Sequence, residues 1–94
     1  MKVFISGPIS GVPNYRERFA EAEAELRTLG HVVLNPAALP DGMTQADYMR
    51  LCFAMIDVAD AVLFLRDSEK SVGSNLEHTY AIYTGKEIFR RTRE

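Results

Sequence analysis

The sequence has one cysteine, Cys52, and no apolar run as long as a membrane helix requires. A single cysteine cannot form a disulfide within the chain, so the fold needs no oxidising compartment. A membrane helix takes about 20 apolar residues. The apolar start MKVFIS is interrupted at Gly7 and Pro8, which also argues against a secretory signal. These absences predict a cytoplasmic protein without a membrane partner.

The sequence also lacks a surplus of charge of either sign. Its 11 basic and 13 acidic residues give a formal net charge of −2 and are interspersed along the chain. Nucleic-acid polymers and anionic membranes are bound by concentrated basic surfaces, so neither is predicted as a partner. The exception is the C-terminal cluster Arg90, Arg91 and Arg93, which we interpret as a solvated end.

Several motifs of common enzyme classes are missing. The stretch SGPISGVPN has neither the lysine of a P-loop nor the glycine spacing of a dinucleotide-binding turn. No G-x-S-x-G motif is present, and His31 and His78 have no cysteine or acidic residue at metal-ligand spacing. The sequence therefore predicts no cofactor and no metal site.

The 94 residues, 47% of them hydrophobic and 26% charged, fit one domain over 1–94. A domain of this size buries a smaller fraction of its unfolded surface than a larger domain does, so self-association would add stability. We expect a homo-oligomer.

Hydrophobic patterning predicts alternating strands and helices. Short apolar runs predict strands at 2–6, 31–34, 61–65 and 86–89, and helical spacing of apolar residues predicts helices over 14–29, 44–59 and 74–84. The run AVLFL at 61–65 is apolar throughout, as a central strand covered on both faces requires. Such alternation predicts an α/β fold with a parallel sheet of about four strands and helices on both faces.

Local signals mark the helix ends. Asn14 with Glu17, and Thr44 with Asp47, have the spacing of a capping box, and Gly30 suits the left-handed residue after the first helix.

The second helix carries more apolar residues than one sheet face can cover. We expect Tyr48, Cys52, Met55 and Ala59 to face the sheet, and Met49, Phe53 and Ile56 to face a partner subunit.

In a parallel sheet, ligands bind outside the carboxyl ends of the strands. Three loops are predicted to meet there, and their glycines, hydroxyls and polar groups suit a phosphate or a sugar. The glycines of the first loop also fit a turn that needs them for steric reasons alone. The candidate binding residues are Ser6, Gly7, Ile9, Ser10 and Gly11 from the first loop, Asn35 from the second, and Asp67, Ser71, Gly73 and Ser74 from the third.

Glu77 allows two interpretations. It lies three residues after Ser74, which is the spacing of a capping box. A carboxylate near the start of a helix is also favourably placed for chemistry, because the helix dipole keeps it ionised there. Asp60, just before the central strand, would lie at the edge of the sheet away from these loops, where it could cap a bend or face a neighbouring subunit. Asp67 follows that strand and is the better-placed acid.

Four segments, VFISGPISGVPNYRERF, GHVVLNPA, IDVADAVLFL and SVGSNLEHTYAIYTGK, occur in this order over nearly the whole chain. Together they resemble the nucleoside 2-deoxyribosyltransferase superfamily, particularly its short phage and bacterial branch, which is related to nucleoside 5′-monophosphate N-glycosidases. The resemblance implies a three-layer flavodoxin-like or Rossmann-like fold, a homo-oligomer, and cleavage of the N-glycosidic bond of a nucleoside or nucleotide.

The resemblance also implies residue roles. The position of Glu77 is that of the nucleophile, that of Asp60 lies near the nucleobase, and that of Ser71 binds a 5′-phosphate. A family tyrosine whose hydroxyl orients the glutamate is replaced here by Phe4. Tyr15, Tyr48 or Tyr80 would have to supply a hydroxyl instead.

Three functions follow as expectations, of which the third is a small assembly protein with no ligand. The first is an N-glycosidase or deoxyribosyltransferase in which Glu77 attacks C1′ while Asp60 or Asp67 protonates or orients the base. The second, favoured by Phe4 and the short C-terminal region, is a non-catalytic module that senses or sequesters a nucleotide.

Overall fold

The computed structural model describes residues 1–91 and contains a parallel sheet of four strands in the order β2-β1-β3-β4. The strands are β1 (Lys2–Ser6), β2 (Val32–Leu34), β3 (Ala61–Phe64) and β4 (Glu87–Arg90). Each of the four predicted strands is present within one residue of its expected bounds. The α/β prediction is confirmed.

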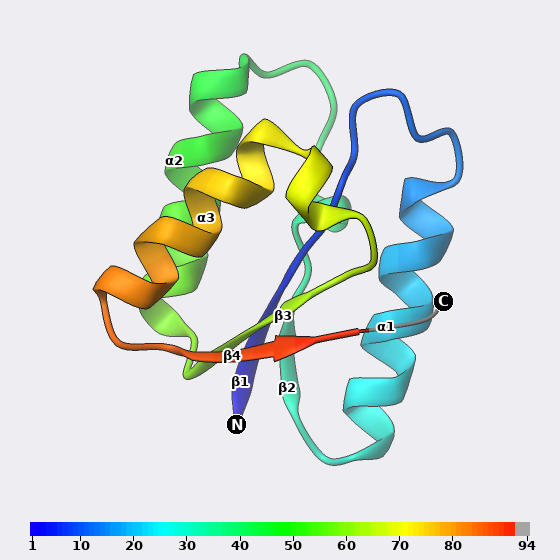
Figure 1. Cartoon of the computed structure of the whole chain (residues 1–94). Helices are drawn as coiled ribbons and strands as arrows, with labels where there is room; N and C mark the ends of the chain where they lie inside the picture. The colour runs from blue at the N-terminus through cyan, green and yellow to red at the C-terminus, as the bar shows by residue number, and fades with distance from the viewer. Residues whose placement is uncertain (92–94) are drawn as a thin grey trace.

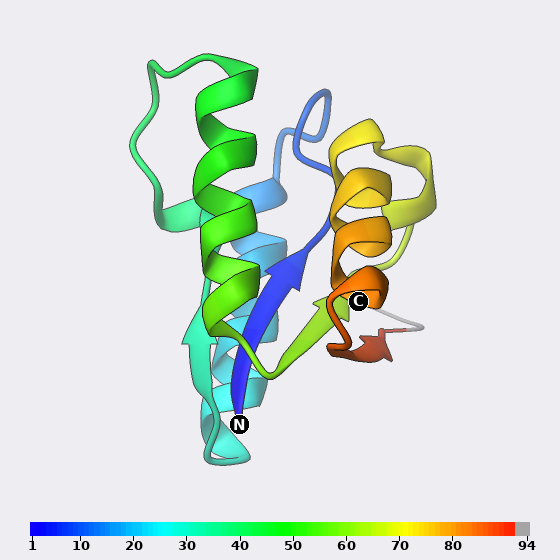
Figure 2. The same cartoon turned by 90° about the vertical axis from the view of Figure 1, so that its left-hand side faces the viewer.

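Helices cover both faces of the sheet (Figures 1 and 2). Helix α1 (Tyr15–Thr28) lies on one face, and α2 (Gln45–Val58) and α3 (Val72–Tyr83) lie side by side on the other. Two short 3-10 turns, η1 (Pro36–Ala38) and η2 (Ser68–Lys70), follow β2 and β3. The molecule therefore has three layers, as the resemblance implies.

The alternation of side chains along β1 divides the core in two. Val3 and Ile5 point toward α1, whereas Phe4 points toward α2 and α3, and all three are fully buried. The first cluster adds Phe19, Ala22, Leu26, Ala61 and Leu65, and the second adds Cys52, Ile56, Ala59, Val62, Phe64 and Ala81.

The strand order reverses between β1 and β3. The chain passes from β1 outward to β2 and then returns to place β3 on the other side of β1. At such a switch point the loops after the two central strands diverge and leave a crevice at the carboxyl edge. This crevice contains the candidate site.

The helix ends differ in part from the predictions. The capping box of Thr44 and Asp47 is confirmed by reciprocal hydrogen bonds of 3.1 and 3.2 Å. Gly30 has the predicted left-handed conformation, with φ of 88°. The capping box of Asn14 with Glu17 is wrong, because the Asn14 side chain makes no cap hydrogen bond in its conformation with ψ near 25°.

The expectation that Phe53 and Ile56 face a partner subunit is also wrong. Ile56 is fully buried within the second cluster, and the Phe53 ring stacks on Tyr80 of α3 with their centroids 4.4 Å apart. Because α3 packs beside α2 on the same face of the sheet, it covers the apolar side that a single sheet contact leaves open.

The basic cluster at the end of β4 is not a simple solvated end. The side chain of Arg91 is only 13% exposed and pairs with Glu25 at 2.9 Å, and the Arg90 guanidinium lies over the Phe64 ring. Arg93 lies outside the described residues. Within residues 1–91, no helix is long and apolar enough to cross a bilayer, and no three acidic, histidine or cysteine side chains gather as metal ligands.

Gly7 illustrates how tightly the end of β1 packs. A Cβ atom at this position would lie 3.0 Å from Cδ1 and 3.1 Å from Cβ of Leu65. We expect Gly7→Ala to lower the free energy of unfolding by roughly 1–3 kcal/mol because the buried Leu65 has little room to move. Urea denaturation would measure the change. Gly73→Ala is the control, since its Cβ would meet the flexible terminal methyl of Met49 at 3.3 Å and Ser71 Oγ at an ordinary 3.9 Å. Equal losses in both variants would contradict the prediction.

Candidate functional site

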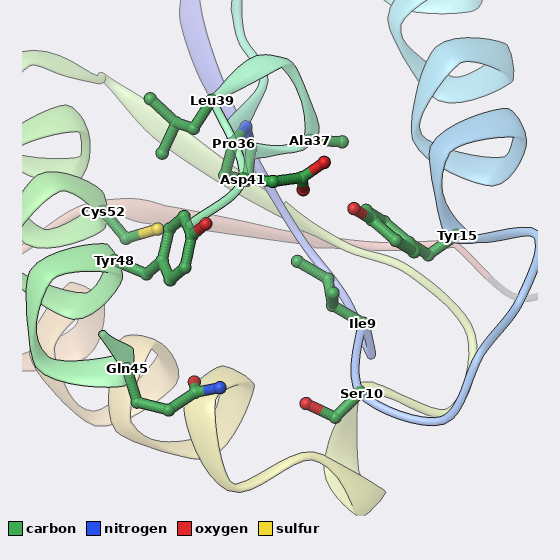
Figure 3. A pocket seen from close by; sticks show the side chains of 10 residues that line it. All are labelled: Ile9, Ser10, Tyr15, Pro36, Ala37, Leu39, Asp41, Gln45, Tyr48 and Cys52. Carbon is green, nitrogen blue, oxygen red and sulfur yellow. The ribbon is translucent and has the colours of Figure 1, made fainter. Parts of the chain in front are cut away.

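A cleft runs across the carboxyl edge of the sheet, between the loop after β1 and the facing ends of α2 and α3. It consists of three adjoining cavities of about 230, 110 and 640 Å³. Ile9, Ser10 and Gln45 line all three, so the cavities form one continuous space. In the first cavity, shown in Figure 3, Tyr48 and Cys52 come from α2, and Tyr15 lies across the cavity from them.

Glu77 lies at the floor of the middle cavity. It sits on α3 with only 7% of its surface exposed, and its Oε1 accepts a hydrogen bond of 2.6 Å from Ser6 Oγ at the end of β1. The Ser6 and Ser74 hydroxyl oxygens are 3.0 Å apart, and both residues are buried. A carboxylate on one element is thus tied to a strand that lies 71 residues away in sequence.

The capping interpretation of Glu77 is wrong. Helix α3 begins at Val72, and its N-cap is Ser71, whose Oγ accepts a hydrogen bond of 3.3 Å from the backbone N–H of Ser74. Because the helix starts earlier than predicted, Glu77 falls in its second turn and faces the cleft floor, where it is not needed as a cap.

Burial dominates the electrostatics of Glu77. Loss of solvent raises its pKa to about 7, while hydrogen bonds from Ser6 and Cys52 act in the opposite direction. The Cys52 thiol in turn has its pKa raised to about 12 by burial and by the neighbouring Glu77. The thiol therefore stays protonated at neutral pH, beside Glu77 in the same cavity.

The first loop reaches the cleft in part. Ser6, Gly7, Ile9 and Ser10 line the middle cavity. Gly11 adopts a left-handed conformation with φ of 77° and lines none of the three cavities. The turn, which needs this left-handed conformation, explains why the residue at position 11 is a glycine.

The third loop also reaches the cleft only in part. Ser71, Gly73 and Ser74 line the middle cavity together with Glu77. Asp67 stays outside the three cavities, where it has a φ of 67° and pairs with Lys70 at 3.5 Å. Its short polar side chain tolerates this left-handed conformation better than most.

Asn35 acts beside the cleft instead of inside it. Its side chain accepts a hydrogen bond of 2.9 Å from the backbone N–H of Ala37 and donates another of 2.9 Å to Glu23. These bonds hold the η1 turn, whose Pro36 lines the first and middle cavities.

Asp60 lies at the opposite edge of the sheet from Glu77. Its Oδ2 accepts a hydrogen bond of 2.8 Å from the backbone N–H of Lys2, which lowers the pKa of the carboxyl. Lys2 and Ser6 are the two ends of β1, and the four residue steps between them span about 13 Å. The structure therefore does not bring Asp60 and Glu77 together within one chain.

The tyrosines considered as replacements for the family hydroxyl make other hydrogen bonds. Tyr48 Oη donates to the Pro40 carbonyl at 2.7 Å, and Tyr80 Oη donates to Asp57 at 2.6 Å. Tyr15 lines the first cavity but not the one that contains Glu77. Ser6 supplies the hydroxyl bound to Glu77.

Several cleft residues were not singled out as site residues in the sequence. Gln45, Met49 and Cys52 come from α2, where helical periodicity indicates only packing. Asp41 comes from the second loop and pairs with Arg16 at 2.8 Å. The one signal that pointed to this region was the predicted meeting of three loops at the sheet edge.

Comparison with solved structures identifies the fold. The chain superposes on the 2-deoxyribosyltransferase from Bacillus psychrosaccharolyticus with a TM-score of 0.77 at 19% identity, over 96% of this chain and 71% of that one. It superposes on the 2-desoxiribosyltransferase from Leishmania mexicana with a TM-score of 0.76 at 21% identity, over 95% of this chain and 62% of that one. The chain thus spans less than two thirds of the length of the Leishmania mexicana enzyme.

No curated protein matches this sequence. The family described as "Domain of unknown function (DUF4406)" matches residues 1–90. The chain therefore belongs to this family, and it has the nucleoside 2-deoxyribosyltransferase-like fold that its sequence resembles.

Proposed function

We propose that the protein cleaves the N-glycosidic bond of a nucleoside or nucleoside 5′-monophosphate, by hydrolysis or by deoxyribosyl transfer, with Glu77 as nucleophile. The observation that carries this proposal is the buried Glu77 carboxylate at the floor of the cleft, bound to Ser6 at 2.6 Å. Burying a carboxyl without a charged partner is unfavourable. Carboxyls whose pKa is shifted by such burial are common at catalytic centres. The relatives named above are 2-deoxyribosyltransferases, which supports the same chemistry.

The reaction has two steps. One Glu77 oxygen attacks C1′ as the bond from C1′ to the base nitrogen breaks, and the base leaves with the bonding electrons and takes up a proton. The resulting glycosyl ester is then opened by water, which gives the free sugar, or by the nitrogen of a second base, which gives a new nucleoside. The low solvent exposure of Glu77 strengthens its interaction with the positive charge that develops at C1′.

A group that protonates or orients the base is also needed. Asp60 was expected in this role, and in this fold it would have to reach the cleft from another chain. Asp67 lines none of the cavities that adjoin Glu77. We propose Asp41 and Gln45, which line the first cavity, as the groups that contact the base.

The alternative is a non-catalytic module that binds a nucleotide in the same cleft. Phe4 favours this function because it replaces the tyrosine that the resemblance to nucleoside 2-deoxyribosyltransferases implies at this position. The bond from Ser6 to Glu77 favours catalysis, because a binding module has no need to bury a carboxylate against a ligand that carries a phosphate.

Incubation with a panel of nucleosides and nucleoside 5′-monophosphates, followed by chromatography for free base, separates the two functions. Base release that grows as pH rises through about 7, where Glu77 ionises, supports the enzyme. Saturable binding without release supports the module. The absence of both base release and binding would contradict both proposals.

Ser71 is proposed to contact the 5′-phosphate, since it caps α3 and lines the two cavities nearest the start of that helix. We expect Ser71→Ala to raise KM for monophosphates at least about tenfold more than for nucleosides, because only the phosphate uses the lost hydroxyl. Steady-state kinetics would measure the ratio. Thr44→Ala, which removes the cap of α2, is the matched control, and an equal rise for both substrates in Ser71→Ala would contradict the role.

The expected homo-oligomer remains a proposal. The exposed apolar side chains on α3 support it, namely Val72, Leu76 and Tyr83 at 78%, 50% and 90% exposure. Light scattering that gives the mass of one chain would contradict it.

A further inference from the structure

The tyrosine hydroxyl that the resemblance to nucleoside 2-deoxyribosyltransferases implies is absent at Phe4, yet Glu77 is not left without a donor. Alternate residues of a strand point to the same face, so Ser6 projects from β1 on the same side as Phe4, toward α2 and α3. A serine two residues further along the strand therefore offers a hydroxyl to the same helix that a tyrosine at position 4 would face.

The geometry also fixes the direction of the hydrogen bonds. The Ser6 hydroxyl has one proton, and its 2.6 Å contact with a carboxylate oxygen is the stronger of its two contacts. When Glu77 is ionised it can only accept, so the Ser6 proton points at Glu77. The 3.0 Å contact between Ser6 and Ser74 must then be donated by Ser74. The hydrogen bonds therefore run from Ser74 to Ser6 and from Ser6 to Glu77.

A second donor approaches from a different element. Cys52 on α2 lines the middle cavity with Glu77 and is 7% exposed, so its buried thiol lies where it can donate to the carboxylate. Strand β1 and helix α2 thus each place one neutral donor on a side chain of α3. Neutral donors stabilise the ionised carboxylate without adding a fixed positive charge to the cleft.

We propose that Ser6 is the positioning residue of Glu77, that Ser74 orients Ser6, and that Cys52 is the second donor, so that two neutral donors take the place of the family's tyrosine. This inference rests on the proposed function for its catalytic meaning, whereas the donor arrangement can be tested without catalysis.

Few other titratable groups face Glu77. Among the described residues that line its cavity, Cys52 and Tyr48 on α2 are the others that titrate, and Tyr48 Oη is held by the Pro40 carbonyl. Strands β1 and β3 present Phe4, Val62 and Phe64 to this layer of the core. The ring of the neighbouring His78 packs against Phe64 and contacts Arg90, outside the cavity. Among these neighbours there is therefore no charged group whose effect on Glu77 would compete with that of the neutral donors.

The test is the titration of Glu77 itself. In protein labelled with ¹³C at the glutamate side-chain carboxyl, the Glu77 signal is assigned by its absence from Glu77→Gln and followed against pH. We expect Ser6→Ala to raise the midpoint by about one to two pH units, the effect of losing a hydrogen bond to a charged group. Ser74→Ala should raise it by less, because Ser6 still donates.

Two further variants test the sign of the effect. Cys52→Ser replaces a weak thiol donor with a stronger hydroxyl of similar size and should lower the midpoint. Ser6→Thr retains the hydroxyl and should leave the midpoint close to that of the unmodified protein. Thr79→Ala, which removes an exposed hydroxyl from the same helix, is the control. An unchanged Glu77 midpoint in Ser6→Ala would overturn the proposal. If Ser6→Ala fails to fold, a raised Glu77 midpoint in Cys52→Ser would overturn it instead.

Base release measured on the same variants separates this inference from the proposed function. Shifted midpoints without base release in any variant would retain the donor arrangement and reject the enzyme. Base release whose pH dependence is identical in Ser6→Ala and the unmodified protein would retain the enzyme and reject the positioning role.

Discussion

Glu77→Gln should lower the rate of base release by a factor of at least about 10³, the range seen when a covalent nucleophile is removed. Glutamine has nearly the same volume as glutamate and keeps an oxygen that can accept from Ser6. It lacks the negative charge that stabilises the developing oxocarbenium ion and cannot form the glycosyl ester. The rate measured by chromatography at pH 8, where Glu77 is ionised, is the appropriate comparison.

The matched control for this experiment is Glu69→Gln, which makes the same substitution at an exposed residue before α3. It should leave base release unchanged. Base release by Glu77→Gln at the unmodified rate would reject Glu77 as nucleophile. Retention of nucleotide binding by the inactive variant is expected, because the hydroxyls and backbone groups of the cleft remain in place.

The same substitution should increase stability at alkaline pH. The pKa of Glu77 is about 7 in the folded protein, against 4.5 for an ordinary glutamate. Between these values the folded state binds more protons than the unfolded state, so Glu77 makes the protein less stable as pH rises through this window. The full loss is about 3 kcal/mol, a large share of the stability of a small domain.

Urea denaturation of the two proteins from pH 4 to pH 8.5 would measure this effect. At pH 4 both side chains are neutral, and the difference in free energy of unfolding reflects only the exchange of a hydroxyl for an amide. Above pH 8 the difference should have moved by about 3 kcal/mol in favour of Glu77→Gln. A difference that stays constant across the range would mean that burial does not perturb Glu77.

The two expected results belong to one trade-off. Desolvation strengthens the action of a carboxylate on a developing positive charge but destabilises the folded state. The rise in stability and the fall in activity should therefore appear together in Glu77→Gln, which is typical of functional sites.

The sequence predicted the fold closely for local reasons. The runs at 2–6 and 61–65 are apolar because both faces of β1 and β3 are covered by helices, and this pattern is visible without tertiary information. The box of Thr44 and Asp47 formed as expected because both partners lie within one turn. Asn14 does precede the first helix as its N-cap residue, but its side chain makes no cap hydrogen bond. In the third helix the N-cap is Ser71 and not Ser74, because sequence spacing decides poorly between neighbouring polar residues.

The site was predicted less completely, because its contacts join distant segments. Ser6, Ser10, Ser71 and Ser74 were placed correctly at the cleft by topology alone. Asp67 and Gly11 were not, since their loops turn away from it. Cys52 looked like an ordinary core residue because helical spacing cannot tell a thiol that packs from one that donates to a carboxylate.

By itself the sequence determined the alternation of strands and helices, the parallel sheet, and the sheet edge at which Glu77 had to lie. Tertiary structure alone decided what holds Glu77 there. Ser6, Cys52 and Ser74 come from three different elements. The packing of α3 against the end of β1 sets the 2.6 Å hydrogen bond between Ser6 and Glu77. Periodicity records which face of an element is buried, but not which side chain of another element it meets, so this arrangement had to be seen in the structure.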